Sequence, residues 1–211
     1  MSGHSAGRPY EAILFDFDGV LVDTEPVHFG CWQEALAPLN IHLEWEFYLN
    51  RCVGVADQSL LQLFHELAGP AIPFENVHAT YERKRELFRQ RVMADVPMPP
   101  ATRSLFTRLE GYRLAVVSSS SRSEVEPPLE RVGLHGYLDT IVCAEDVRRY
   151  KPSPEPYRLA AERLKVRRAL VVEDSEAGQA SGRAAGFDVL FVPHPQQTAA
   201  LLAAHLGLGS I

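Results

Sequence analysis

Short apolar runs recur along the second half of the chain, and stretches with helical spacing of apolar positions separate them. The runs occupy 114–118, 140–143, 170–173 and 189–192, and a similar run, AILFDF, occupies 12–17. Helical spacing extends over about 124–132, 154–165 and 176–186. Strands that are almost wholly apolar are typical of a parallel sheet covered on both faces, and the alternation is that of successive βαβ units. We predict an α/β fold with a Rossmann-like parallel sheet core.

A long segment between the first two apolar runs shows no strand pattern. Its apolar side chains recur at helical spacing, first over residues 29–39. Thr24 as N-cap and Pro26 in the first turn indicate where the first helix begins, and the proline-rich VPMPP ends the segment. We predict that residues 24–96 form an inserted helical cap domain. The predicted core domain consists of 1–23 and 97–211.

Composition narrows the classes of protein that fit. The 211 residues are 46% hydrophobic, which suits one ordinary core with a sizeable insertion. No run approaches the roughly 18 apolar residues of a membrane helix, and the first residues lack the apolar core of a signal peptide. A net charge of −6 argues against non-specific nucleic-acid binding. We expect a cytoplasmic monomer, without nucleic-acid or membrane partners, that acts on a small molecule.

Cysteine use and local composition give five further expectations. Three cysteines, far apart, are expected to be buried free thiols. The basic stretch YERKRELFRQR is interpreted as a solvated helix face, and His28 as a partly exposed helix residue. Gly178, Gly182 and Gly186 recur every four residues, which indicates close packing of a helix on the sheet, with Gly186 as C-cap. The pair Pro127-Pro128 is expected to delay or kink its helix.

Polar and charged side chains follow the ends of four predicted strands. In an open parallel sheet, ligands collect at these carboxyl ends. Each group alone is more commonly structural, because Asp-x-Asp is frequent by chance and a serine run usually marks a turn. Their arrival at successive strand ends predicts a functional site. The groups are Asp16, Asp18, the serines from Ser118 on, Lys151, Glu173 and Asp174.

The two acids of the first strand raise an electrostatic question. In a strand, Asp16 and Asp18 would point to one face, where like charges and desolvation raise the free energy of both carboxylates. Bound Mg²⁺ removes this cost, and carboxylate oxygens are its preferred ligands. A carboxylate can attack phosphorus, and a neighbouring acid can protonate the departing oxygen and then activate water. The residues therefore predict phosphoryl transfer, with Asp16 as nucleophile and Asp18 as acid and base.

Four segments carrying these groups resemble the motifs of the haloacid dehalogenase superfamily, in order and over nearly the whole chain. They are DFDGVLVDTE, VVSSS, KPSPEPY and VVEDSEAG. The resemblance implies a phosphohydrolase, because family members that are dehalogenases lack the second acid, here Asp18. It also implies that the Asp18 backbone carbonyl binds Mg²⁺, that Asp174 is a metal ligand, and that Glu173 binds the metal directly or through water. The expected phosphate and substrate contacts are Ser118, Ser119, Lys151, Gly19, Thr24 and Arg122.

The position of the insert resembles the cap of β-phosphoglucomutase and of many sugar-phosphate phosphatases. In the mutases a basic pair brackets a cap glycine to hold a second phosphate, and the Arg expected after Gly54 is absent here. Arg51 is poorly placed to replace it, whereas Arg122 partly substitutes for a core lysine. We therefore expect a phosphatase acting on a small phosphorylated metabolite. A sugar phosphate mutase and a non-catalytic phosphate-binding or regulatory protein remain the alternatives.

Overall fold

The computed structural model describes residues 8–53, 55 and 57–209, with only the backbone at 57 and 58. The chain divides into two compact units. The core unit consists of Met1–Asp23 and Val96–Ile211, and the cap unit of Thr24–Asp95. Within the described part of the chain, no helix is long and apolar enough to span a membrane.

The described residues of the core unit contain one sheet of five parallel strands, in the order β3-β2-β1-β4-β5. The strands are β1 (Ala12–Phe15), β2 (Arg113–Val117), β3 (Thr140–Val142), β4 (Ala169–Glu173) and β5 (Asp188–Phe191). β1 lies between β2 and β4, so the chain changes direction across the sheet at this central strand. The predicted α/β fold is confirmed, and each strand lies within two residues of its expected bounds.

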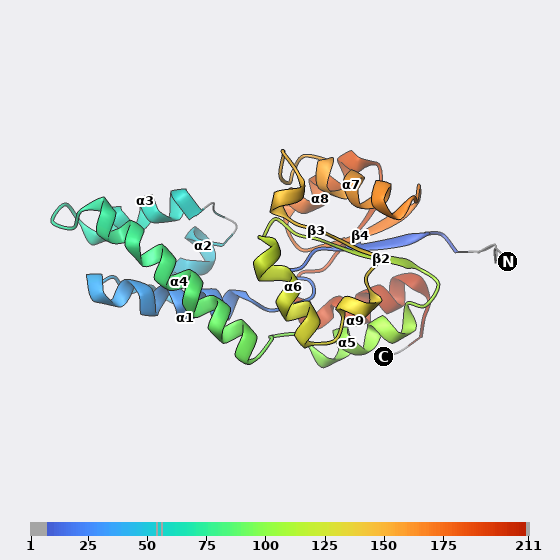
Figure 1. Cartoon of the computed structure of the whole chain (residues 1–211), viewed down its shortest axis with the longest axis horizontal. Coiled ribbons are helices and arrows are strands. Elements are labelled where there is room, and N and C mark those ends of the chain that lie inside the picture. The colour runs from blue at the N-terminus through green and yellow to red at the C-terminus, as the bar shows by residue number, and fades with distance from the viewer. Residues whose placement is uncertain (1–7, 54, 56, 210–211) are drawn as a thin grey trace. The chain divides into compact units, whose positions relative to one another are not determined.

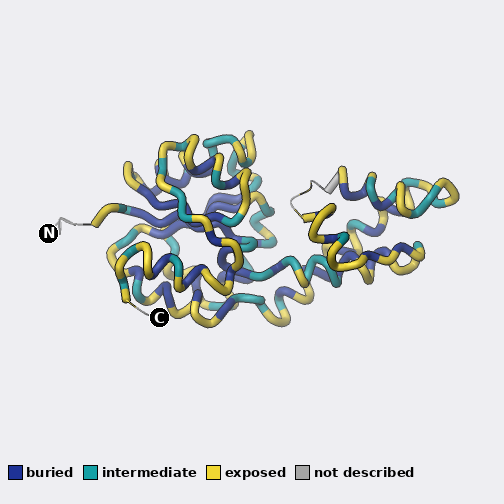
Figure 2. Tube along the Cα trace, turned by 180° about the vertical axis from the view of Figure 1, so that it is seen from behind, coloured by how far each residue is buried: buried dark blue, intermediate teal, exposed yellow. Residues whose placement is uncertain are grey.

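Helices cover both faces of the sheet (Figure 1). The helices of the core unit are α5 (Pro100–Leu105), α6 (Arg122–Arg131), α7 (Glu155–Leu164), α8 (Glu176–Ala185) and α9 (Pro195–Leu206). Apolar residues of α5, α6 and α9 pack on one face together with Ile13 and Phe15 of β1. Those of α7 pack on the other face with Ala12 and Leu14. Figure 2 shows the buried strands between these layers, and all four residues of β1 are fully buried.

The cap unit is helical, as the sequence pattern predicts. Its helices are α1 (Glu25–Leu36), α2 (Trp45–Arg51), α3 (Asp57–Ala68) and α4 (Phe74–Ala94). Single 3₁₀ turns in the two units occupy Ala37–Leu39, Phe106–Arg108, His135–Tyr137 and Ala144–Asp146. Trp32, Leu36 and Phe64 are central to an apolar cluster of the cap unit's own. Thr24 occupies the N-cap position of α1 but makes no side-chain cap hydrogen bond.

The basic stretch of α4 is only partly a solvated face. Arg83 and Arg89 form exposed ion pairs, with Glu34 and Glu86. Lys84 is instead buried, and its ammonium lies 5.5 Å and 5.2 Å from the ring centroids of Trp32 and Phe88. The solvated-face interpretation is therefore wrong for Lys84, because a long side chain on the inner face of a helix can cover aromatic surface.

The same inner face of the cap unit holds the ring of His28. This ring stacks on Phe88 with 4.0 Å between centroids. Burial, with a smaller effect of the Lys84 ammonium, holds the pKa of His28 well below its ordinary value. His28 is therefore neutral near pH 7, as is expected of an imidazole that is desolvated beside a cation.

The expectations on the cysteines and on Gly186 are confirmed, whereas the expected delay of a helix at the proline pair is wrong. The free thiols Cys31, Cys52 and Cys143 are buried, as expected. Gly186 ends α8 with a φ of 92°, which confirms the C-cap. The proline pair does not delay α6, which begins at Arg122 and includes both prolines. A capping box of Ser121 and Glu124 supports this start.

Candidate active site

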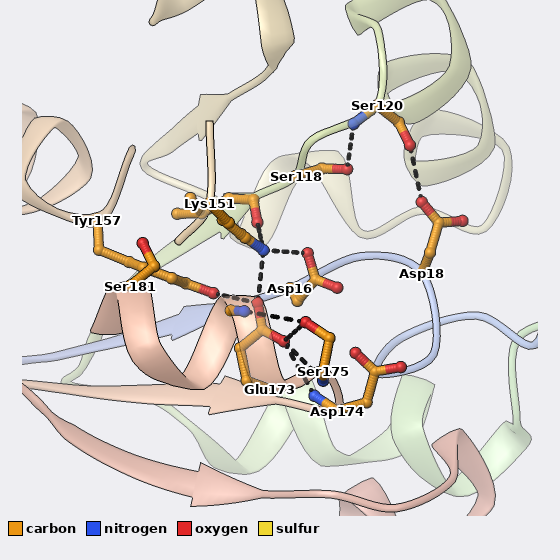
Figure 3. A network of polar contacts seen from close by, with 12 residues as sticks. Asp16, Asp18, Ser118, Ser120, Lys151, Tyr157, Glu173, Asp174, Ser175 and Ser181 are labelled. Atoms are coloured by element: carbon orange, nitrogen blue, oxygen red, sulfur yellow. Dashed lines mark hydrogen bonds and ion pairs between the residues drawn. The ribbon is translucent and has the colours of Figure 1, made fainter. Parts of the chain in front are cut away.

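The carboxyl ends of β1, β2 and β4 bring the predicted groups together at one edge of the sheet (Figure 3). Asp16 follows β1 directly, and its backbone N–H continues the ladder by donating to the Val172 carbonyl at 3.0 Å. Ser118 follows β2 in the same way, donating to the Val142 carbonyl at 2.9 Å. Glu173 is the last residue of β4. The backbone hydrogen bonds of the sheet therefore fix the Cα positions from which these side chains project.

Lys151 joins three of the converging segments. Its Nζ donates to Asp16 Oδ1 and to Glu173 Oε1, both at 2.6 Å, and to the Val117 carbonyl at 3.0 Å. An ammonium has three N–H donors, so these contacts use all of them. The Lys151 side chain is only 6% exposed. Its charge is thus applied to the Asp16 carboxylate in a nearly dry environment, where electrostatic effects are stronger than in water.

Asp18 is placed differently from the sequence expectation. β1 ends at Phe15, so the two-residue alternation of a strand does not extend to Asp18, which lies in the turn that follows. Its Oδ2 accepts a hydrogen bond from the Ser120 hydroxyl at 2.9 Å, and the Ser120 N–H donates to Ser118 Oγ at 3.0 Å. The serine run that follows β2 therefore orients Asp18, and Figure 3 shows the Asp18 carboxylate directed at Ser120.

Glu173 is fully buried and receives hydrogen bonds on both oxygens. Oε1 accepts from Lys151 and, at 2.8 Å, from the Tyr157 hydroxyl. Oε2 accepts from the Asp174 N–H at 3.0 Å, and from the Ser175 N–H and hydroxyl at 3.1 Å and 3.0 Å. The same Ser175 oxygen caps α8 by accepting from the Gly178 N–H. The buried carboxylate thus ties α7, β4 and the start of α8 to Lys151.

Two glycines make room for the adjacent acids at the end of β4. A Cβ atom on Gly19 would lie 2.0 Å from Asp174 Oδ2, and one on Gly178 would lie 1.7 Å from Glu173 Oε1. Gly182 contacts the sheet instead, since its Cβ would meet Val189 at 2.9 Å. The packing interpretation is confirmed for Gly182. Gly178 faces a carboxylate rather than apolar side chains.

Burial and mutual repulsion perturb the acids. Desolvation, with the negative charges of Glu173 and Asp174, raises the pKa of Asp16 well above its ordinary value, although Lys151 opposes this. Burial, followed by the charge of Glu173, raises the pKa of Asp174 to about 7. Burial would also raise the pKa of Glu173, but the Lys151 ammonium and the hydrogen bonds outweigh it and lower that pKa. Strongly perturbed groups of this kind are typical of functional sites.

Three of the acids can approach a common cation. One oxygen from each of Asp16, Glu173 and Asp174 lies within 4.8 Å of the others. The Asp18 side chain is not part of this cluster. The carboxylate oxygens are hard ligands, which suit Mg²⁺. With all three acids ionised, the Lys151 ammonium offsets only part of their charge, so a divalent cation fits the cluster.

The other predicted contacts lie outside this group of side chains. Ser119 is exposed beside it. The Arg122 guanidinium pairs with Glu126 and, at 2.5 Å, with Asp146. Thr24 is buried in the cap unit. Gly54 and Ala56, on which the comparison with mutase caps depends, and the side chain of Asp57 lie outside the described residues.

Sequence reasoning missed the partners that orient the acids. Ser120 was included only as a member of the serine run, without a role, and Tyr157 and Gly178 were not assigned to the site, although all three lie inside the quoted motifs. The serine run and the segment KPSPEPY contain the hydroxyls. A search for donors placed near each buried acid could have suggested them, but their contacts depend on the tertiary structure.

Comparison with known proteins finds the same family in sequence and in structure. A family profile described as haloacid dehalogenase-like hydrolase matches residues 13–192. Fructose-1-phosphate phosphatase YqaB of Escherichia coli is 30% identical over 188 residues, which are 87% of this chain and 96% of that protein. CbbY of Rhodobacter sphaeroides, solved in complex with phosphate, is 30% identical with a TM-score of 0.68, covering 85% of this chain and 84% of that one. A β-phosphoglucomutase of Clostridium difficile shares the fold, at 21% identity and a TM-score of 0.70 over 89% of this chain and 92% of that one.

Proposed function

Because the chain belongs to the haloacid dehalogenase-like hydrolase family, we propose that it is a Mg²⁺-dependent phosphatase of a small phosphorylated metabolite, such as a sugar phosphate. The observation that carries this proposal is the contact of Lys151 with Asp16 at 2.6 Å, beside the Glu173–Asp174 pair. The Lys151 ammonium orients this carboxylate for nucleophilic attack and reduces its repulsion toward an anionic phosphate. The phosphatase activity named for the Escherichia coli relative supports the substrate class.

The donor set of the site supports the proposed cofactor. Asp16 and Asp174 would hold Mg²⁺, together with the Asp18 backbone carbonyl that the family resemblance implies. The carboxylates are held close together, although desolvation and repulsion raise the pKa of Asp16 and of Asp174. When bound, the ion would neutralise these charges and the charge of the phosphoryl oxygens.

The first half of the proposed reaction forms a covalent intermediate. An Asp16 oxygen attacks phosphorus, and the bond from phosphorus to the ester oxygen breaks. The departing alkoxide takes a proton from Asp18, whose orientation is set by Ser120. Ser118 Oγ accepts from the Ser120 N–H, so the Ser118 hydroxyl proton is available to donate to a phosphate oxygen.

The second half returns the enzyme to its starting state. Asp18, now ionised, takes a proton from water as the water attacks the aspartyl phosphate. The bond between Asp16 and phosphorus breaks, inorganic phosphate leaves, and Asp18 is again protonated. One group thus serves as acid and then as base, while the covalent intermediate on Asp16 divides a difficult displacement into two easier steps.

Asp16→Asn tests the proposal directly. We expect hydrolysis across a panel of phosphorylated metabolites to fall to background, because an amide is a far weaker nucleophile, while the circular dichroism spectrum stays unchanged. A chelator should also stop the wild-type reaction, and added Mg²⁺ should restore it. Full turnover by Asp16→Asn would reject the nucleophile assignment, and a wild-type enzyme inactive on every ester would favour the non-catalytic alternative.

The mutase alternative is less well supported by the described residues. A mutase must hold a second phosphate, and Arg122, the core cation expected to help, already pairs with Glu126 and Asp146. We therefore expect glucose 1-phosphate, if it is a substrate, to yield free phosphate. Accumulation of glucose 6-phosphate without free phosphate would establish the mutase instead.

A further inference from the structure

The carboxylate of Glu173 has little capacity left for a metal ion. A carboxylate offers about four lone-pair positions. Hydrogen bonds from Lys151, Tyr157, Asp174 and Ser175 place five donor atoms within 3.1 Å of its two oxygens. Direct metal ligation would have to displace a donor that is itself largely removed from water. Such a displaced donor would pay its full desolvation cost.

Tyr157 occupies a special position among these donors. It lies in the first turn of α7, is fully buried, and reaches across to the end of β4. Its hydroxyl shares Oε1 of Glu173 with Lys151, whose Nζ lies 5.1 Å from the centroid of the Tyr157 ring. The phenol therefore contacts both members of the ion pair that adjoins the nucleophile.

We propose that Tyr157 is a positioning residue that holds Glu173 as the counterion of Lys151, outside the inner coordination of the metal. The Tyr157 hydroxyl fixes Oε1, and the backbone at Ser175 fixes Oε2. Gly178 closes the third side, since a Cβ there would overlap the carboxylate. Glu173 then holds Lys151 against Asp16, while Asp174 is left to contact the metal. The kinetic part of this inference rests on the proposed phosphatase function.

Crystals of the wild-type protein soaked in Mn²⁺ test the metal part without any substrate. Anomalous scattering would locate the ion. We expect it within about 2.3 Å of Asp16 and Asp174 oxygens, close to the usual metal–oxygen distances. We expect both Glu173 oxygens beyond about 3.5 Å, too far for direct coordination. An ion at direct ligand distance from Glu173 would overturn the proposal.

Tyr157→Phe tests the positioning part, because it removes one hydroxyl and keeps the buried ring. Loss of a hydrogen bond to a charged group should lower kcat about tenfold, with KM and the Mg²⁺ activation constant unchanged. Tyr10→Phe is the matched control, since Tyr10 also donates to a carboxylate, that of Asp188 at 3.0 Å. Tyr10 lies just before β1, at the opposite edge of the sheet from the site. The kcat of Tyr10→Phe should therefore equal that of the wild type.

Lysine labelling supplies a readout that needs no turnover. The chain has three lysines, and the exposed Lys165 serves as internal reference for Lys151. With an acetylating reagent and peptide mass mapping, we expect Lys151 labelling relative to Lys165 to rise about tenfold in Tyr157→Phe, as its counterion loosens. Tyr10→Phe should label like the wild type.

The outcomes separate this inference from the proposed function. Wild-type kcat together with wild-type labelling in Tyr157→Phe would overturn the positioning role. If Tyr157→Phe does not fold, the Mn²⁺ position in wild-type crystals still decides the place of Glu173. If the wild-type protein hydrolyses no ester, the proposed function fails, while diffraction and labelling continue to test the inference alone.

Discussion

At the scale of single residues, two glycines make room for the acids that lie beside Asp16, the proposed nucleophile. Gly19 has a φ of 74°, which disfavours any residue with a side chain, and its missing Cβ leaves the space that Asp174 occupies. Gly178 does the same for Glu173. The positions of both carboxylates therefore depend on the absence, at Gly19 and Gly178, of the Cβ atom that every other residue carries.

Gly19→Ala should separate backbone strain from displacement of Asp174. We expect a stability loss of about 1–2 kcal/mol from the left-handed backbone and a fall in kcat of about 100-fold, because small displacements near the chemistry are costly. Gly207→Ala is the control, since Gly207 has a φ of 67° and open space around it. It should show a similar stability loss in urea denaturation with wild-type kcat. Equal kcat in the two variants would contradict the role of Gly19.

The raised pKa of Asp174 predicts how Mg²⁺ binding depends on pH. A metal ligand must be deprotonated, and burial raises the pKa of Asp174 to about 7. We therefore expect Mg²⁺ to bind about tenfold more weakly at pH 6 than at pH 8, as isothermal titration calorimetry would measure. Asp174→Asn should bind weakly at both pH values. Equal affinity of the wild type at pH 6 and pH 8 would contradict this assignment.

The raised pKa of Asp174 has the opposite effect on the pH dependence of stability in the metal-free protein. The folded-state pKa of Asp174 lies above the unfolded value of about 4. Its stabilising contribution is therefore complete below about pH 4 and is lost as the pH rises through about 7. Mg²⁺ should accordingly raise the unfolding temperature more at pH 8 than at pH 6.

The residues that perform the proposed chemistry were easier to predict than those that orient them. Asp16 and Asp174 directly follow strands and Lys151 lies in the loop between β3 and α7, and a strand end can be predicted from an apolar run. The contacts of Ser120 and Tyr157 depend on side-chain rotamers and on how α7 packs against the sheet, which no local pattern specifies. The displaced position of Asp18 has a similar cause, since β1 ends earlier than its apolar run.

At the scale of elements, α8 combines a capped start with a face of small residues against the sheet. Ser175 caps it, and Gly182 brings it close to Val171 of β4 and Val189 of β5. The strands and the helices α6, α7 and α8 were predictable from apolar periodicity. α5 was not predicted, because it begins at Pro100, within the proline-rich segment that was interpreted as an end. α9 was not predicted either.

Gly182→Ala measures the packing of α8 on the sheet. A Cβ at this position would lie 2.9 Å from Val189 Cγ2 and 3.1 Å from Val171 Cγ1. Overpacking should destabilise the fold more than the higher helix propensity of alanine stabilises it. We therefore expect the free energy of unfolding, measured by urea denaturation, to fall by about 1 kcal/mol. Gly136→Ala, which meets no atom within 4 Å, is the control and should stay within about 0.5 kcal/mol. A more stable Gly182→Ala would show that the helix can shift freely.

At the scale of the whole molecule, each unit has a hydrophobic cluster of its own. The proposed Mg²⁺ and phosphate site is built from residues of the core unit. Both tryptophans of the chain, Trp32 and Trp45, lie in the cap unit. Tryptophan fluorescence therefore reports on unfolding of the cap unit, whereas far-ultraviolet circular dichroism reports on both units.

Mg²⁺ with inorganic phosphate should stabilise mainly the unit that binds them. We expect these ligands to raise the unfolding temperature measured by circular dichroism more than that measured by tryptophan fluorescence, because binding to the native state shifts only equilibria linked to it. Asp174→Asn should remove the shift. Identical shifts by both probes would indicate that the two units unfold together.

The chain leaves the core unit after Asp23 and returns at Val96, and the two crossing segments are joined where the Asp23 N–H donates to the Pro97 carbonyl at 2.8 Å. The 72 intervening residues therefore leave and re-enter the core unit at neighbouring points, as the residues of one short loop would. Exchange of this insert for that of a relative, cut at the joined pair, should leave the catalytic loops undisturbed. The insert and the core that carries the proposed site would then be separable modules in evolution and in engineering.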